Sequence, residues 1–212
     1  MSVGHLITVN LTDLPEKYFF CDPASGKQPI KKSRGRSAIV GIGADSIERI
    51  FTLVAWASRG TTDMLIDKIL AVNEEWKPRI FGIEANAMQS LFADALRREI
   101  TRRHLRVPLV PVYQPTGIDK DFRIRSVVQP AYAEGRLFVQ AGQHDLLNEI
   151  TSFPTGSTKD LVDALASAIS LVPARSTRAQ RDDETDARLA YLRDSGASPD
   201  YIETVAREAG RV

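Results

Sequence analysis

The sequence contains one cysteine and three histidines, and it lacks any long apolar run. A single thiol, Cys21, cannot form an internal disulfide, which fits a reducing compartment such as the cytoplasm. His5, His104 and His144 are scattered, so no zinc-type cluster of His and Cys ligands is predicted. No apolar segment approaches the roughly 18 residues of a membrane span, and no signal peptide is expected at residues 1–5. These absences argue against disulfide-stapled, zinc-binding and membrane-spanning proteins.

A phosphate loop of the kind that holds ATP is also missing. The nearest segment, Ser25-Gly26-Lys27-Gln28, lacks the upstream glycine and the hydroxyl that follows the lysine in Gly-x-x-x-x-Gly-Lys-Ser/Thr. The chain is therefore not expected to contain an ATP-driven motor. No internal repeat is present either.

What remains is the composition of an ordinary soluble globular protein. The 212 residues are 43% hydrophobic and 26% charged, with a formal net charge of +1. This length allows one good-sized domain plus a tail. We expect a polar lead-in at 1–16, a domain at 17–173 and a polar tail at 174–212. Within the tail, Ser198-Pro199 introduces a short helix at about 200–209.

The elements of the domain follow a simple order, three strands and then helices that alternate with strands. Short apolar runs bounded by turn signals predict the strands, and apolar residues at helical spacing predict the helices. The predicted strands are 17–22, 37–44, 47–57, 79–84, 107–113 and 135–139, the predicted helices are 63–76, 85–103, 145–153 and 159–171, and 114–126 is a predicted polar loop. We therefore expect an α/β fold with a mixed central sheet, an antiparallel hairpin unit plus parallel strands, flanked by helices. The prolines of 107–113 place that strand at an edge of the sheet.

Two carboxylates stand at the ends of predicted strands. Asp22 follows the aromatic run Tyr18-Phe19-Phe20 and precedes Pro23, while Glu84 ends the strand at 79–84. If these strands are parallel neighbours, both acids lie at the carboxyl-end edge, where ligands gather in such sheets. A turn-capping Asp and a surface or N-cap Glu are the plain alternatives.

A third acidic contribution comes from the last helix of the domain. Asp160 and Asp163 are three residues apart, so they share one face of that helix. Asp163 interrupts an otherwise apolar side, whereas Asp160 has a favourable interaction with the helix dipole as its plain alternative. Acids from separate elements lie close together only when cations neutralise them. Hard divalent ions take oxygen ligands, and two such ions about 3.5–4 Å apart activate water and stabilise the leaving oxygen in phosphodiester cleavage.

The acids belong to an ordered set of short motifs that resembles the nuclease domain of phage terminase large subunits, a branch of the RNase H-like superfamily. The set covers about residues 17–172. Its segments are Phe20-Cys21-Asp22-Pro23-Ala24, Ile83-Glu84-Ala85-Asn86, Lys120 to Arg123, Gly135-Arg136-Leu137-Phe138, Leu147 to Pro154, and Asp160-Leu161-Val162-Asp163-Ala164-Leu165-Ala166. Many relatives have Asp-Asp-x-x-Asp in the last helix, where this chain has Lys159 before Asp160. That departure leaves open whether Asp160 or Asp163 is the principal ligand.

The resemblance implies an RNase H-like, metal-dependent DNA endonuclease that acts during phage genome packaging by a two-metal mechanism. It implies that Asp22, Glu84, Asp160 and Asp163 are catalytic and bind two Mg²⁺ or Mn²⁺ ions. The implied partners are double-stranded DNA, the terminase ATPase domain, the small terminase subunit and the portal, in the bacterial host cytoplasm and away from any membrane. Because the ATPase motif is missing, we expect a nuclease domain that is excised or separately encoded. A Holliday-junction-resolvase-like nuclease and a non-catalytic DNA-binding packaging module are the alternatives.

Basic residues near the acids are candidate DNA contacts. The candidates are Lys27, Lys31, Lys32, Arg34, Arg36, Lys120, Arg123 and Arg125. Such side chains contact phosphates without reading sequence, with a solvated loop as the plain alternative. No interleaved aromatic platform for single strands is evident, so the backbone of duplex DNA is the expected ligand.

Overall fold

The structure, a computed structural model, describes residues 10–24, 35–85, 91–114, 117–173, 188–195 and 197–208. The chain divides into two compact units, Met1–Val172 and Pro173–Val212, and each is described by itself. Among the described residues, no helix combines the length and the apolar character needed to cross a membrane. Of the predicted DNA contacts, Lys27, Lys31, Lys32 and Arg34 lie outside the described residues.

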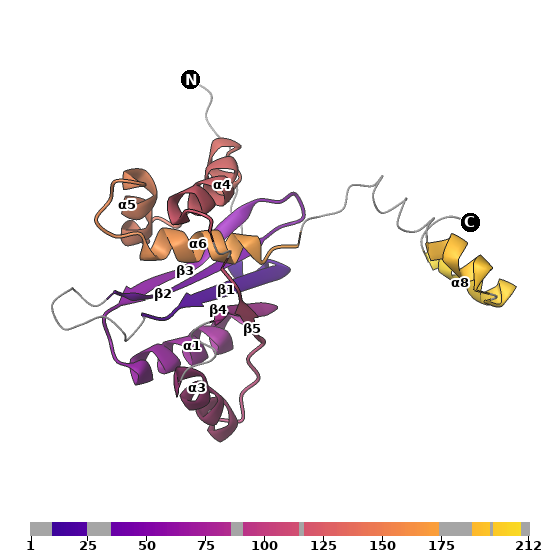
Figure 1. Ribbon diagram of the computed structural model, residues 1–212, viewed down its shortest axis with the longest axis horizontal. Coiled ribbons are helices and arrows are strands. Elements are labelled where there is room, and N and C mark those ends of the chain that lie inside the picture. Colours follow the sequence, from indigo (N-terminus) through magenta and orange to yellow (C-terminus); the bar gives the residue numbers. More distant parts are fainter. Residues whose placement is uncertain are drawn as a thin grey trace. The chain divides into compact units, whose positions relative to one another are not determined.

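One six-stranded mixed sheet forms the centre of the first unit (Figure 1). Its strands are β1 (Glu16–Asp22), β2 (Ser37–Ala44), β3 (Ile50–Ser58), β4 (Ile80–Glu84), β5 (Leu109–Val112) and β6 (Leu137–Phe138), in the order β5-β4-β1-β2-β3-β6. Strand β2 is antiparallel to β1 and β3, whereas the β1–β4, β4–β5 and β3–β6 pairs are parallel. The predicted hairpin unit with added parallel strands is therefore confirmed, with β5 at an edge.

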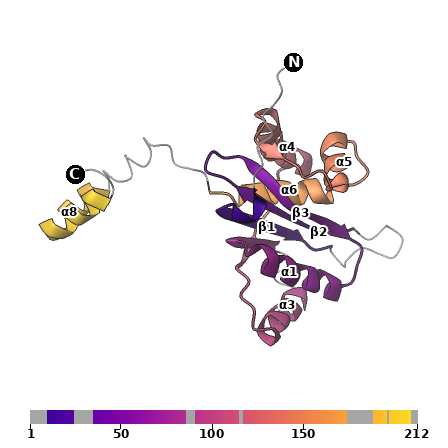
Figure 2. The same cartoon turned by 180° about the vertical axis from the view of Figure 1, so that it is seen from behind.

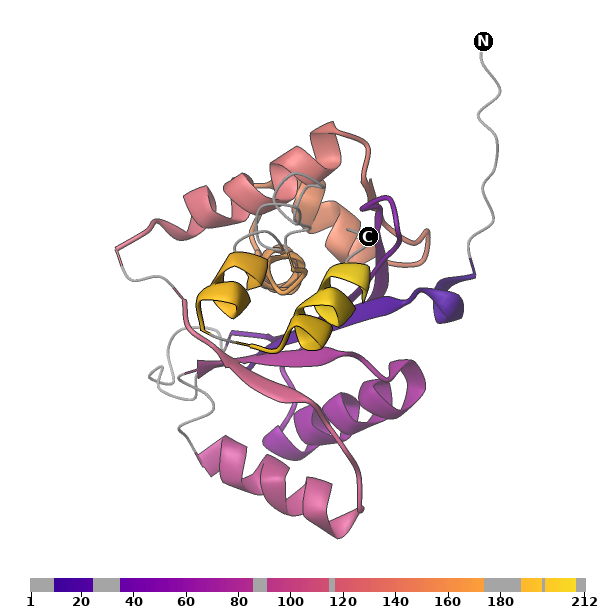
Figure 3. The ribbon, with the colours of Figure 1, turned by 90° about the vertical axis from the view of Figure 1, so that its right-hand side faces the viewer.

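Helices cover both faces of this sheet, as the side view in Figure 3 shows. The helices α4 (Lys120–Ala133), α5 (His144–Ser152) and α6 (Asp160–Ser170) lie over one face, and α1 (Thr62–Trp76) and α3 (Leu91–Arg102) lie over the other (Figures 1 and 2). Strand β1 serves both layers because successive side chains point to opposite faces. Tyr18 and Phe20 pack in the cluster with α6, whereas Phe19 and Cys21 pack in the cluster with α1.

The sheet tolerates these aromatic side chains because a neighbouring strand makes room for them. A Cβ placed on Gly41 of β2 would lie 2.3 Å from the ring of Phe19. The ring therefore occupies the space that a side chain at position 41 would take, and glycine is required there by close approach.

Two predictions of local structure were wrong. Residues 114–126 were expected to be a loop, but α4 begins at Lys120 inside that segment. Asp119 caps the helix by accepting a hydrogen bond from the main-chain N–H of Phe122 at 3.0 Å, and Ile124 and Val128 bury its inner side. Strand β3 also begins at Ile50 rather than at residue 47, because Asp45 accepts hydrogen bonds from the N–H groups of residues 47 and 49 and holds a turn there.

The second unit contains helical residues at 188–194 and the helix α8 (Pro199–Glu208). The Ser198 hydroxyl accepts a hydrogen bond from the N–H of Tyr201 at 3.3 Å, which confirms the predicted helix start. Leu189, Val205 and Ala206 form a small buried cluster. This unit thus has an apolar cluster of its own.

Candidate active site: carboxylates at the ends of the central strands

Asp22 and Glu84 end two adjacent strands of the sheet. Strands β1 and β4 are parallel, and their register pairs Cys21 with Ile83. The next residue on each strand is an acid, so both carboxylates reach the same edge. This meeting was predicted from the two strand ends, and the structure brings the two side chains into hydrogen-bonding contact.

The electrostatic state of Asp22 reflects this contact. Burial, the charge of Glu84, the hydrogen bond to Glu84 and the charge of Asp163 together raise the pKa of Asp22 from 3.8 to about 7, although Lys120 opposes them. Nearby like charges favour the protonated form of a carboxyl group, so Asp22 keeps its proton to a higher pH than an exposed aspartate does. Asp22 is thus ready to exchange its proton for another cation near neutral pH.

Asp163 brings a third carboxylate toward the cluster from the first turn of α6. It is buried, with 6% of its surface exposed. The Lys120 ammonium lies 2.8 Å from one of its oxygens, and the Arg123 guanidinium pairs with the other. Burial alone would lower the pKa of Lys120, but its interactions with Asp163 and the charges of Asp22 and Asp160 raise that pKa above its usual value. Side-chain cations from α4 therefore neutralise Asp163.

Asp160 belongs to a different set of contacts. Its carboxylate accepts a hydrogen bond from Arg36 Nε at 2.9 Å, and Arg36 also forms an ion pair with Glu149. Arg36 was predicted to bind DNA, yet its side chain is only 15% exposed and has two acidic partners within the protein. The structure thus places Asp163, rather than Asp160, beside Lys120 and Arg123.

Glu149 on α5 is a structural residue whose role sequence reasoning missed. Its carboxylate is buried and accepts hydrogen bonds from the main-chain N–H groups of Leu161, at 2.8 Å, and Val162, at 3.1 Å. These donors lie in the first turn of α6, where Lys159 provides no side-chain cap. Glu149 therefore caps α6 from another helix. The available signal was its helical spacing from Leu146, which puts an acid on the buried side of α5.

Helix α4 is fixed against α6 by one further ion pair. The Lys159 ammonium lies 2.7 Å from a carboxylate oxygen of Asp121. Together with the contacts of Asp163, this bridge ties the first turn of α4 to the start of α6. Arg125, by contrast, is exposed and makes no ion pair with any residue that the structure describes.

The chemistry of the donor set fits a hard divalent cation, because the three acids offer only carboxylate oxygens. As the chain stands, no group of three or more His, Cys, Asp or Glu side chains within the described ranges is arranged to hold a metal ion. Instead, the raised pKa of Asp22 favours its protonated form, and Lys120 with Arg123 compensates the charge of Asp163. These are the positive charges that a divalent ion would replace.

Several solved structures with a similar fold are nuclease domains of phage large terminases. The large terminase nuclease from thermophilic phage G20c has a TM-score of 0.54 and 14% identity, over 74% of this chain and 83% of that chain. The P22 large terminase nuclease domain has a TM-score of 0.50 and 14% identity, over 71% and 78%. The G20c nuclease with bound zinc gives 0.50 and 16%, over 75% and 84%. No family model and no curated protein matches the sequence. The chain therefore has the RNase H-like fold that is seen in the nuclease domains of phage large terminases.

Proposed function

We propose that this chain is a divalent-metal-dependent endodeoxyribonuclease that acts in phage DNA packaging, with its nuclease domain at 17–173. The observation that carries this proposal is the meeting of Asp22 and Glu84 at the ends of parallel strands, with Asp163 close enough to shift the pKa of Asp22. An acid such as Asp22, whose pKa is raised at the edge of a sheet, is a candidate for a functional role. The fold shared with terminase nucleases supports the same conclusion.

Asp22, Glu84 and Asp163 would hold the metal, and Asp160 would complete the site once it is released from Arg36. Two Mg²⁺ or Mn²⁺ ions would supply an activated water and a stabilised leaving oxygen when bound. Asp22 gives up its proton readily near neutral pH because its pKa is about 7. Lys120 and Arg123 would donate hydrogen bonds to DNA phosphate oxygens once they are released from Asp163.

Plasmid nicking tests the proposal directly. The purified chain should relax supercoiled plasmid with Mg²⁺ or Mn²⁺ and show little sequence preference, while Asp22→Asn should be inactive. A parallel measurement of melting temperature should show a Mn²⁺-dependent rise in the wild type and a smaller rise in Asp22→Asn. A plasmid left intact with both metals, with no stabilisation by Mn²⁺, would overturn the proposal.

Varying the DNA substrate in the same assay distinguishes a packaging nuclease from a junction resolvase. Cleavage confined to four-way junctions would assign a resolvase activity, whereas cleavage of linear duplex and plasmid fits packaging. Double-stranded DNA is the proposed substrate, and a terminase ATPase domain, a small terminase subunit and a portal are the proposed partners in the host cytoplasm. Co-purification with the ATPase domain of the same phage would test that assembly.

A further inference from the structure

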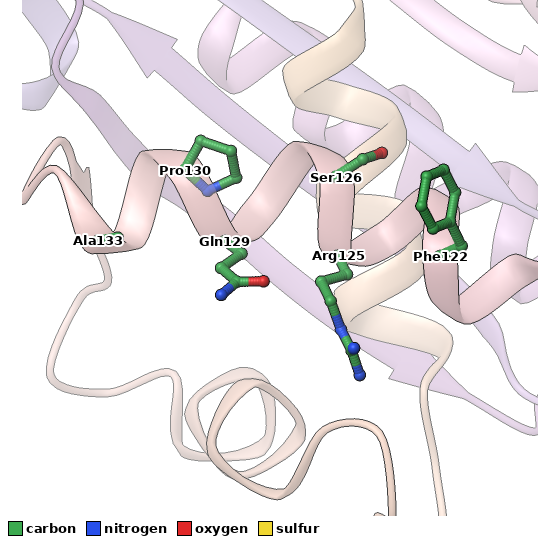
Figure 4. Close-up of a pocket in the computed structure, with 6 residues that line it drawn as sticks. All are labelled: Phe122, Arg125, Ser126, Gln129, Pro130 and Ala133. Atoms are coloured by element: carbon green, nitrogen blue, oxygen red, sulfur yellow. The ribbon is translucent and has the colours of Figure 1, made fainter.

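The outer face of α4 carries a hollow that the acidic cluster does not use. Its volume is about 430 Å³, within the range of roughly 300–1,000 Å³ that is usual for small-molecule sites. Two rows of side chains line it, and within each row the residues are one helical turn apart. One row consists of Phe122, Ser126 and Pro130, and the other of Arg125, Gln129 and Ala133. In the view of Figure 4, Phe122 and Pro130 lie above the axis of the helix, and Arg125 and Gln129 lie below it. The hollow is therefore apolar along one edge and polar along the other.

The apolar row offers a flat surface and a hydrogen-bond acceptor. Phe122 is 66% exposed, so most of its ring is accessible to a ligand. Pro130 lies within the helix and has no N–H, so the carbonyl of Ser126 loses its normal intrahelical donor. A planar ligand that carries an N–H donor would satisfy both features.

The polar row offers a positive charge without an acidic partner. Lys120 and Arg123 on the same helix both pair with Asp163, whereas Arg125 has no ion pair among the described residues. An unpaired guanidinium on a helix surface is a ready contact for a phosphate group. The amide of Gln129 adds a donor and an acceptor one turn further along.

We propose that this face of α4 holds one unpaired nucleotide of a DNA strand, with its base against Phe122 and its phosphate on Arg125. The inference rests on the proposed nuclease function and adds to it a contact with one locally unpaired nucleotide of the DNA substrate. Aromatic rings stack on any base, but only on one that has left the duplex stack. Helix α4 links the two sites physically, because its first turn contacts Asp163.

This proposal revises the expectation that DNA contact is limited to the duplex backbone. A loop at 114–126 would not bring Phe122 and Arg125 onto a common surface. The helix does so, because residues three apart are neighbours on a helical face.

Fluorescence anisotropy with the full chain tests the inference. The probes are fluorescent oligothymidine and the duplex that it forms with oligoadenine, both in EDTA so that no cleavage occurs. Phe122→Ala should weaken single-strand binding by about 5- to 100-fold, the loss expected from one base stack, and leave duplex binding unchanged. Phe122→Tyr should retain the affinity because it keeps the ring. Tyr191→Ala removes a similarly exposed ring from the second unit and serves as the matched control.

Plasmid nicking by the same proteins keeps the two proposals separable. If the wild type nicks plasmid but Phe122→Ala binds oligothymidine as tightly as the wild type, this inference is wrong and the nuclease function stands. If the wild type neither nicks plasmid nor binds either probe, both are wrong. If Phe122→Ala changes the oligomeric state instead, the face is a protein contact and the inference is wrong. Photocrosslinking of iodouracil-substituted oligothymidine to Phe122 would support it directly.

Discussion

Glu149 should be one of the most sensitive positions in the first unit, although it lies outside the acidic cluster. Replacement by alanine leaves two main-chain N–H groups at the start of α6 without an acceptor and removes one partner of Arg36. Loss of a helix cap costs about 1 kcal/mol, and each hydrogen bond to a charged group contributes roughly 1.5–3 kcal/mol. Arg36 keeps Asp160, so the cost of stranding its charge stays below the roughly 3–5 kcal/mol of a broken buried pair.

We therefore expect Glu149→Ala to lower the free energy of unfolding by about 3 kcal/mol. For a unit of this size, that corresponds to a fall in melting temperature of roughly 6–12 °C. Glu149→Gln keeps an acceptor oxygen but loses the charge, and it should cost about 1–2 kcal/mol. The two variants together separate the contribution of the cap from that of the ion pair.

Urea unfolding followed by tryptophan fluorescence measures this loss cleanly. Both tryptophans, Trp56 and Trp76, lie in the first unit, so the signal reports on that unit alone. The midpoint should fall while the slope of free energy against urea stays constant. Glu75→Ala, an exposed site on α1, is the control and should change stability by less than about 0.5 kcal/mol. A Glu149→Ala midpoint as high as that of the control would refute the reasoning.

Three further predictions concern the site and the sheet. Without divalent ions, the raised pKa of Asp22 means that the folded chain loses stability as the pH rises from about 4 to 7. At about pH 8, the free energy of unfolding of Asp22→Asn should therefore be roughly 1–4 kcal/mol higher than that of the wild type, whereas at about pH 4 the two proteins should be equally stable. Equal stability of the two proteins by urea unfolding at the higher pH would contradict this assignment. Lys120→Gln removes a cation that competes for Asp163, so the Mn²⁺ concentration at half-maximal thermal stabilisation should fall by about 3- to 10-fold; an unchanged midpoint would show that Lys120 does not compete with metal. Gly41→Ala forces a Cβ against Phe19 and should destabilise the chain by roughly 1–3 kcal/mol in the urea assay, whereas Gly142→Ala has open space and should be nearly neutral.

The acids of the site were predictable because they follow strong local signals. The aromatic run before Asp22 and the proline after it define where β1 ends, and Glu84 ends an equally clear apolar run. Helical spacing identified Asp163 as an acid on a buried side. These patterns depend on neighbours in the sequence, which is the information that a single chain provides.

The partners of these acids were not predictable in the same way. Arg36 meets Glu149 and Asp160 across sequence separations of 113 and 124 residues, and nothing local specifies such a meeting. Helix α4 was missed because its first turns carry Lys120, Arg123 and Arg125 and its interior contains Pro130, so the segment lacked the apolar spacing of a helix. Tertiary packing of Ile124 and Val128 against the core supplied what intrinsic propensity did not.

Because α6 lies at the end of the first unit, the core and the acidic cluster can be completed only late in synthesis. Asp22 belongs to the first strand and Asp163 to the last helix, and α6 also covers Tyr18 and Phe20. During synthesis, the N-terminal strands therefore emerge with one face uncovered until α6 has left the ribosome. A nascent or truncated chain that ends before α6 lacks both a finished core and a third acid. Helix α6 thus completes the core and the acidic cluster in one step, so that incomplete chains carry no assembled site.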